Sequence, residues 1–436
     1  MPTLADAIGG KDRVIGGPFG SKLTQADYAD FGVPVIRGSN MPSMGKSIGG
    51  PFAYVSTCKF ERDLRSNSAQ RGDIIVTQRG TLGQVGIIAD DIGYDTFVVS
   101  QSQMAVRVDA QKANRDFVYY FLTSPGFNDY VEKSTIQTGV PHINLGLLRE
   151  TPVVWPDLRT QAAIAAVLGA LDDKIELNRR MNETLEAMAR AIFKDWFVDF
   201  GPTRAKMEGR APYLAPDIWS LFPDRLDDEG KPEGWTSYSL GRLASQHTAS
   251  VAPSSSPNEV FEHFSLPAYD AGRSPTHDLG ETIKSNKTTL PKDAVLLSKL
   301  NPEIERVWIP EPASGKRQVC STEFLVFTPH AGGNRPLLFG LFTELSFRTL
   351  LQSMVTGTSK SHQRISPPAL LGRQILIGSE PTFDQYAAVT EPLLARTLAN
   401  RSESRTLAAT RDFLLPKLMS GEVRVKDAEK LVGEVA

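Results

Sequence analysis

The sequence contains little cysteine and no long apolar run, and each absence excludes a class of protein. Its 436 residues include only two cysteines, Cys58 and Cys320, and neither belongs to a CxxC pair. A disulfide framework or a structural zinc site is therefore not expected, and a reducing environment fits. The first residues, MPTLADAIGGKDR, lack the apolar segment of a signal peptide, and no run has membrane-spanning length. We therefore expect a cytoplasmic protein.

An excess of positive charge is also missing. The formal net charge is −2, and the proportions of charged (22%) and hydrophobic (41%) residues are ordinary for a globular chain. Proteins that bind nucleic acid over a broad electrostatic surface are usually basic. Any DNA binding by this chain must therefore depend on a few well-placed cations, or on a partner that supplies the phosphate contacts.

Motifs of the common catalytic sites are absent as well. The sequence has no Walker A, GxSxG or HExxH motif, and Asn301-Pro-Glu-Ile304 only begins like the NPPY motif of adenine methyltransferases. Asp224, Glu229 and Lys231 have the order of a PD…ExK nuclease, whose carboxylates bind Mg²⁺, but they lie in a segment rich in proline and glycine. The sequence thus predicts no catalytic residue and no metal site, with a standalone Mg-dependent nuclease as an alternative.

One stretch that is present, residues 158–200, predicts a single long helix. It contains no proline and one glycine, and Asp157 precedes it as a candidate N-cap. Apolar or small side chains recur in steps of four and three, the spacing of a coiled-coil seam. This seam comprises Ile164, Leu168, Leu171, Ile175, Asn178, Asn182, Leu185, Ala189, Ile192 and Trp196. About 40 helical residues span roughly 60 Å, which indicates a spacer, and asparagines in a seam favour the register in which they meet.

The second half of the chain repeats the first. KDAVLLSK (292–299) follows GDIIVTQR (72–79), and STEFLVF (321–327) follows QSQMAVR (101–107), both at an offset of 220 residues. A second long helix is expected after Thr382, which forms a capping-box pattern with Gln385. Its seam comprises Tyr386, Thr390, Leu393, Thr397, Asn400, Ser404, Leu407, Arg411, Leu414 and Leu418. The repeat implies two modules, each a globular domain followed by a helix.

These patterns give an α+β fold class with two mixed, β-rich domains. Short strand-like runs between turn clusters support the β-rich character. We expect a first domain at 1–157, a helix at 158–200, a linker at 201–234, a second domain at 235–381, a helix at 382–420 and a tail at 421–436. The two helices are expected to pair antiparallel as a coiled coil, with pseudo-two-fold symmetry between the halves.

An aromatic cluster closes the first helix. Phe193, Trp196, Phe197 and Phe200 are more aromatic surface than one helical stripe needs. They would cover either a domain of the same chain or a partner subunit, and the first interpretation is favoured.

Several stretches resemble a known family. GDIIVTQRGTLGQVGII (72–88), FKDWFVDF (193–200) and LPKLMSGEVRV (415–425) are similar to the specificity (S) subunit, HsdS, of type I restriction–modification systems. The resemblance covers nearly the whole chain. It implies two target-recognition domains, each recognising half of a bipartite DNA sequence in phage defence, and a helix pair that sets the spacer. The second domain departs from the first, with TGTSKSHQRI (356–365) in place of TGVPHINL.

The resemblance also implies partners and cofactors. The helix pair would dock two methyltransferase (M) subunits, and restriction (R) subunits would complete the enzyme. No cofactor is expected in this chain, since S-adenosylmethionine would bind the M subunits, and ATP and Mg the R subunits. A purely structural scaffold, binding DNA without base preference, is the remaining alternative.

Candidate DNA-contacting residues are polar or cationic side chains beside turns, because base edges are recognised by such groups on exposed loops. In the first domain they are Lys22, Arg37, Asn40, Arg79, Thr81, Thr138 and His142. In the second domain they are Lys299, Asn301, Lys360, His362 and Arg364. For each of them, a solvated turn is the alternative interpretation.

Overall fold

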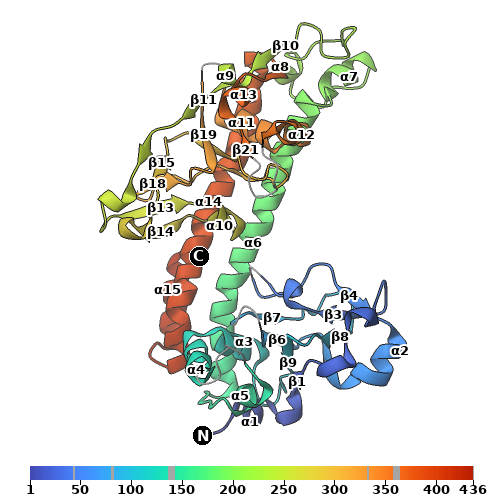
Figure 1. Cartoon of the computed structure of the whole chain (residues 1–436), viewed down its shortest axis with the longest axis vertical. Coiled ribbons are helices and arrows are strands. Elements are labelled where there is room, and N and C mark those ends of the chain that lie inside the picture. The colour runs from blue at the N-terminus through green and yellow to red at the C-terminus, as the bar shows by residue number, and fades with distance from the viewer. Residues whose placement is uncertain (43–44, 80–82, 136–142, 331–332, 357–363, 436) are drawn as a thin grey trace. The chain divides into compact units, whose positions relative to one another are not determined.

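The computed structural model describes residues 1–42, 45–79, 83–135, 143–330, 333–356 and 364–435 (Figure 1). Its contacts divide the chain into two units. Unit 1 is Met1–Leu177 with Glu403–Ala436, and unit 2 is Asn178–Ser402. Two long helices, α6 (Leu158–Phe197) and α14 (Glu380–Ser420), each contribute residues to both units.

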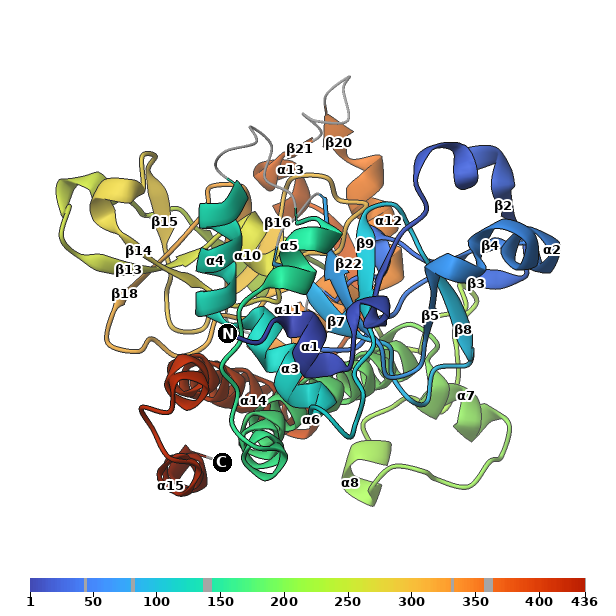
Figure 2. The same cartoon turned by 90° about the horizontal axis from the view of Figure 1, so that it is seen from below.

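Unit 1 contains two sheets. The four-stranded antiparallel sheet has the order β1 (Val14–Gly16), β9 (Gln103–Val106), β6 (Ile74–Thr77), β7 (Val85–Ile87). The five-stranded sheet, visible beside α2 (Thr57–Lys59) in Figure 2, has the order β2 (Tyr28–Ala29), β4 (Ala53–Val55), β3 (Val33–Ile36), β8 (Thr96–Val99), β5 (Ser68–Gln70). Its β3 and β8 run parallel. The remaining helices are α1 (Leu4–Ile8), α3 (Arg115–Thr123), α4 (Pro125–Thr135), α5 (Leu145–Glu150) and α15 (Val425–Val435).

Unit 2 has corresponding sheets. The four-stranded sheet has the order β11 (Ala244–His247), β19 (Phe324–Pro329), β16 (Val295–Ser298), β17 (Val307–Trp308). The five-stranded sheet has the order β12 (Ser250–Val251), β15 (Lys287–Thr289), β18 (Arg317–Cys320), β13 (Val260–Phe264), β14 (Thr276–Leu279), with β13 and β18 parallel. Two small sheets pair β10 (Thr236–Ser239) with β22 (Gln374–Gly378), and β20 (Val355–Thr356) with β21 (Arg364–Ile365). Its helices are α7 (Gly201–Met207), α8 (Pro216–Trp219), α9 (Leu240–Leu243), α10 (Leu266–Asp270), α11 (Arg335–Thr343), α12 (Leu345–Ser353) and α13 (Pro367–Leu371).

The internal repeat is confirmed element by element. Helices α3 and α4 begin at Arg115 and Pro125, and α11 and α12 begin 220 residues later, at Arg335 and Leu345. In each four-stranded sheet, the first strand of the module pairs with the fourth, which then pairs with the second. The same sequence pattern therefore specifies the same local topology twice.

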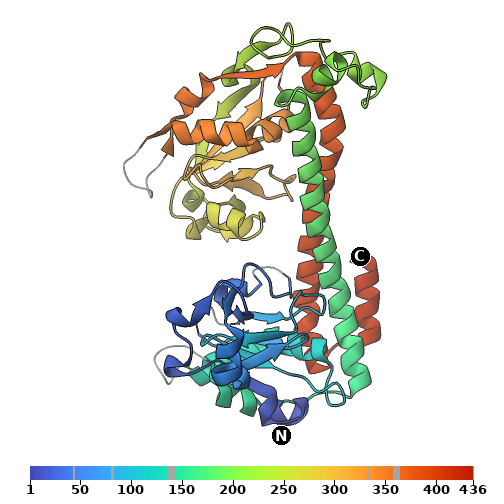
Figure 3. The same cartoon turned by 90° about the vertical axis from the view of Figure 1, so that its right-hand side faces the viewer.

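The two long helices lie side by side and antiparallel in each unit (Figure 3). In unit 1, Asp172 bonds Arg411 at 2.7 Å. In unit 2, the Tyr386 hydroxyl donates to the Ala189 carbonyl at 3.1 Å. Rising numbers on α6 thus meet falling numbers on α14. The predicted seam is confirmed, since its side chains are buried, among them Leu168, Leu171, Leu407, Leu414, Tyr386 and Thr390, all 0% exposed.

The seam asparagines meet, as the sequence predicts. Asn400 Nδ2 donates to Asn182 Oδ1 at 2.9 Å, and Asn178 Nδ2 lies 3.5 Å from the Asn400 carbonyl. Asn178 and Asn400 are each 1% exposed. Because a buried amide without a partner is costly, this contact disfavours a shifted register.

The helix starts give one confirmed and one wrong prediction. Asp157 caps α6, since its Oδ1 accepts from the backbone N–H groups of Arg159 and Thr160 at 2.9 and 3.0 Å. The hydrogen bonds from Thr160 hold the pKa of Asp157 below its ordinary value. A start after Thr382 is wrong, because α14 already begins at Glu380 and the Thr382 hydroxyl donates to the Ser379 carbonyl at 2.7 Å.

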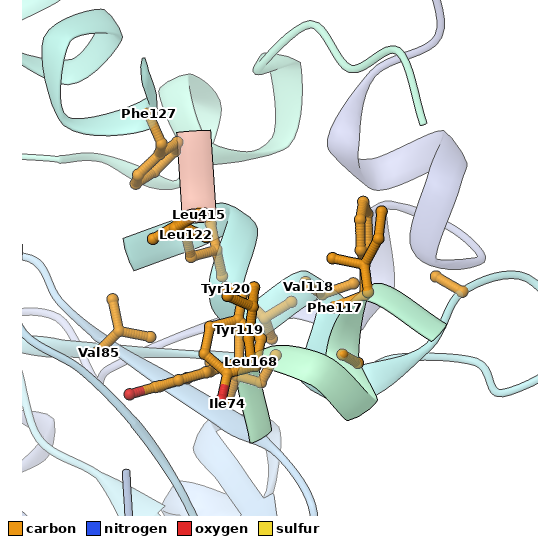
Figure 4. Close-up of a cluster of buried hydrophobic side chains, with 14 of the residues drawn as sticks. Ile74, Val85, Phe117, Val118, Tyr119, Tyr120, Leu122, Phe127, Leu168 and Leu415 are labelled. Atoms are coloured by element: carbon orange, nitrogen blue, oxygen red, sulfur yellow. The ribbon is translucent and has the colours of Figure 1, made fainter. Parts of the chain in front are cut away.

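Each unit has a core that includes both long helices. In unit 1 the side chains of α3 pack between β6, α6 and α14, and Figure 4 shows Tyr120 and Leu122 near Leu168 and Leu415. Ala428 of α15 is buried in the same core. The end of the chain therefore completes the core of the unit that its beginning forms.

In unit 2 the predicted intramolecular role of the aromatic cluster is confirmed. Phe193, Trp196 and Phe197 are at most 4% exposed and belong to the core of that unit, against which Phe200 packs. Trp196 meets the ring of Phe222 edge-on, with centroids 5.2 Å apart. The segment 201–234 is thereby anchored to α6.

Candidate nucleic-acid interface

Corresponding loops follow β6 in unit 1 and β16 in unit 2, and the same backbone hydrogen bonds frame them. In unit 1, Gln78 N donates to Ser102 O at 2.7 Å and Ile143 N donates to Gln78 O at 3.2 Å. In unit 2, Lys299 N donates to Glu323 O at 2.9 Å and Ile365 N donates to Lys299 O at 3.3 Å. One peptide frame therefore carries different side chains in the two units.

The frame of unit 1 presents unpaired cations. Arg79 is exposed just beyond β6, and Lys22 is exposed in a 3-10 turn over Gly20–Lys22. Within the described ranges, neither makes an ion pair. Thr81, Thr138 and His142 lie outside the described residues. Arg79 and Lys22 are thus available for contacts with phosphate oxygens.

Arg37 and Asn40 flank another turn of unit 1 but differ in role. Arg37 is half-buried and lines a cavity of about 680 Å³. Asn40 is 1% exposed, and its Nδ2 donates to the carbonyls of Gly49 and Pro51, both at 3.1 Å. Its Oδ1 accepts from Arg37 N at 3.0 Å. Asn40 therefore stabilises the loop and does not present its amide to DNA, contrary to the sequence-based expectation.

In unit 2 the candidates gather around Glu323. Arg364 binds both carboxylate oxygens of Glu323, at 3.1 and 3.0 Å, which raises the pKa of the Arg364 guanidinium. Lys299 is half-buried, and Asn301 adopts a left-handed backbone (φ 50°) with its Oδ1 buried. Lys360 and His362 lie outside the described residues. Unit 2 thus offers an acidic group and amide chemistry where unit 1 offers cations alone.

The nuclease-like residues do not form one site. Asp224 pairs with Lys206 at 3.0 Å, whereas Glu229 pairs with Lys231. No cluster of potential metal ligands occurs among the residues with assigned positions. Cys58 and Cys320 are free thiols. In the part of the chain that the structure describes, no helix is long and apolar enough to cross a membrane.

Comparisons with known proteins agree with this architecture. Residues 21–187 match the family model described as type I restriction modification DNA specificity domain. The chain is 22% identical to the specificity subunit of the type I restriction enzyme MjaIX of Methanocaldococcus jannaschii, over 86% of this chain and 85% of that protein. It is 24% identical to the HindI specificity subunit of Haemophilus influenzae, over 81% and 87%. The chain belongs to the family of type I specificity (S) subunits.

A solved structure supports the fold of this specificity subunit. The crystal structure of a type I restriction–modification S subunit from M. genitalium superposes with a TM-score of 0.50 at 15% identity, covering 93% of this chain and 92% of that one. At this identity the likeness shows the fold alone. It agrees with two β-rich modules and a long helix pair.

Proposed function

We propose that this specificity subunit selects the DNA target of a type I restriction–modification complex, with each unit recognising one half of a bipartite sequence. The shared loop frame carries this proposal. Because Gln78–Ser102–Ile143 and Lys299–Glu323–Ile365 make equivalent backbone contacts, the two units present their tips in the same way but with different hydrogen-bonding groups. Such a pair suits two different half-sites, since base edges are distinguished by donor and acceptor pattern.

The chain itself supplies recognition, and its partners supply the chemistry. M subunits with S-adenosylmethionine would methylate the DNA, and R subunits with ATP and Mg would cleave it, in the cytoplasm. The seam side chains are buried between the helices, so M subunits would contact the outward faces of α6 and α14. Met188 on α6 and Phe413 on α14 are apolar there and 47% and 56% exposed.

Exchanging residues 1–157 for those of a relative should change only one half of the methylated sequence. The expected result follows from the separate sheets and loops of the two units. The measurement is a genomic map of N6-methyladenine in cells that express the chain with its methyltransferase subunit. An unchanged motif, or a change in both halves, would contradict the modular assignment.

Arg79→Ala should weaken DNA binding by the M–S complex to a similar degree for all sequences. Arg79 is exposed and has no carboxylate partner in the described part of the chain, so it would contact phosphate. Loss of one phosphate contact reduces the slope of log K against log salt by about one. Binding isotherms at several salt concentrations measure that slope. Arg71→Ala is the control, because Arg71 is also exposed but pairs with Asp95 at 3.0 Å; an equal slope change in both variants would reject the contact.

A further inference from the structure

The cavity beside Arg37 is a built feature of unit 1. Residues 23–28, 37–38 and 100–102 line it. Gln101 Nε2 donates to the Gly20 carbonyl at 2.9 Å and so holds the loop that forms one wall. At Gly17 a Cβ atom would lie 2.0 Å from the Ser100 carbonyl oxygen, so this loop packs against 100–101 without room for a side chain. The walls are therefore fixed before any ligand arrives.

Arg37 is the cationic group of this cavity, and its guanidinium is not used within the protein. It lies over the Tyr28 ring, 6.0 Å from the centroid, and its Nε is buried without a hydrogen-bond partner. Other arginines of unit 1 are bound by carboxylates, such as Arg107 by Asp73 at 2.8 Å. No carboxylate lies within ion-pair distance of Arg37 in the described ranges. The aromatic face positions the fork and leaves its donors available.

The other polar groups of the cavity indicate what Arg37 would bind. The Thr24 hydroxyl already donates to Asp27 at 2.8 Å, and Gln101 holds Gly20. The cavity thus has one cation among neutral or committed groups, whereas phosphate sites gather several cations and backbone N–H groups. A single arginine fork with neutral walls suits a base edge with two adjacent acceptors. In the major groove, guanine presents such a pair, O6 and N7.

The corresponding place in unit 2 has different chemistry. Phe264 pairs with Cys320 on parallel strands as Ile36 pairs with Val99, so Ser265 takes the position of Arg37. The Ser265 hydroxyl oxygen accepts from Ala268 N and caps α10. The arginine that follows α10, Arg273, also lies over a tyrosine, Tyr269, but binds Glu186 at 2.8 Å. Unit 2 therefore has no free arginine fork at this position.

We propose that Arg37 is a specificity-determining residue that recognises a guanine, through O6 and N7, in the half-site bound by unit 1. The assignment rests on the proposed function and adds to it the base and the side chain. It also makes the two half-sites chemically unequal, because unit 2 contacts its own half-site without this arginine.

The test uses the full chain in complex with its methyltransferase subunit. Methylation mapping first gives the wild-type motif, and the half altered by exchange of residues 1–157 identifies the half-site of unit 1. Duplexes carrying 7-deazaguanine, which lacks N7, are then substituted at each guanine of that half. Wild-type binding is expected to fall roughly tenfold or more at one position, and Arg37→Ala should be insensitive to the same substitution. Discrimination of guanine from adenine there should fall by roughly ten- to a hundredfold in the variant.

Controls separate recognition from folding and from phosphate binding. Arg37→Lys keeps the charge but loses the fork, so it should retain salt-dependent binding and still lose guanine discrimination. The 7-deazaguanine duplexes test the wild-type complex without any variant. A half-site without guanine, an unaffected 7-deaza series, or a sequence-independent loss in Arg37→Lys would overturn the assignment. A wild-type complex that methylates no bipartite motif would instead reject the proposed function, so the two failures are distinguishable.

Discussion

Replacing Glu186 by glutamine is expected to lower the free energy of unfolding by about 3–5 kcal/mol, because it removes the charge from a buried ion cluster. The Glu186 side chain is 11% exposed. It accepts hydrogen bonds from Arg273 at 2.8 and 2.9 Å and from Arg401 at 2.7 Å. The cluster thus joins α6, α14 and the loop after α10. Without the carboxylate, two guanidinium groups would remain buried with no counter-charge.

A matched control lies one turn earlier on the same helix. Glu183 is 65% exposed and pairs with Arg179 at the i,i+4 spacing. Glu183→Gln should cost less than about 0.5 kcal/mol, since exposed helical pairs contribute little. Chemical denaturation of the full chain measures both variants. Equal destabilisation by the two substitutions would contradict the cluster's role.

The same cluster predicts an acid dependence. Burial by itself would raise the pKa of Glu186, but the charges of Arg273 and Arg401 outweigh it and place the pKa below its ordinary value. A carboxyl group with a depressed folded-state pKa contributes its stability above the unfolded-state pKa of about 4.5, and loses it as the pH falls through the folded-state value. The difference between wild type and Glu186→Gln should therefore be full at neutral pH and shrink on acidification below about pH 4.5.

Trp196→Ala should also destabilise the protein by about 3–5 kcal/mol, as expected for deletion of a buried large aromatic side chain. Trp196 is 2% exposed. Its ring meets Phe222 of the 201–234 segment at 5.2 Å and Tyr386 of α14 at 6.1 Å between centroids. The substitution would leave a cavity where both long helices and that segment meet. Loss of near-ultraviolet circular dichroism on heating gives the shift in Tm.

Met188→Ala provides the comparison for Trp196. It also shortens an apolar side chain of α6, but Met188 is 47% exposed. Its effect on Tm should be a small fraction of that of Trp196→Ala, because little buried volume is lost. Similar Tm values for the two variants would show that the aromatic cluster does not contribute as its burial implies.

The long-range organisation could be predicted from the sequence because it is written in periodic patterns. Steps of four and three residues placed Leu168 and Leu407 in the seam, and the offset of 220 residues placed α11 after α3. Both features depend on the spacing of many residues, so local exceptions do not remove the signal. The start of α14 depends on two hydrogen bonds between Ser379 and Thr382, and a motif two residues further along was equally plausible.

The roles of single polar residues were less predictable. Asn40 lies among glycines and serines like an exposed tip, yet the carbonyls of Gly49 and Pro51 turn its amide inward. Arg364 meets Glu323, 41 positions away, only because the chain folds back beside β19. The sequence identified Arg37 as a candidate, but not the cavity that surrounds it, since three separate segments build that cavity.

The composition of unit 1 has a consequence for biosynthesis. Leu407, Leu414, Leu415, Leu418 and Ala428 complete a core whose other members end at Leu171. Nascent domains generally fold in order from the N-terminus as they leave the ribosome. Here the first module must wait for the last codons before its apolar surface is covered, so a premature stop late in the gene would damage the half of the protein that was translated first.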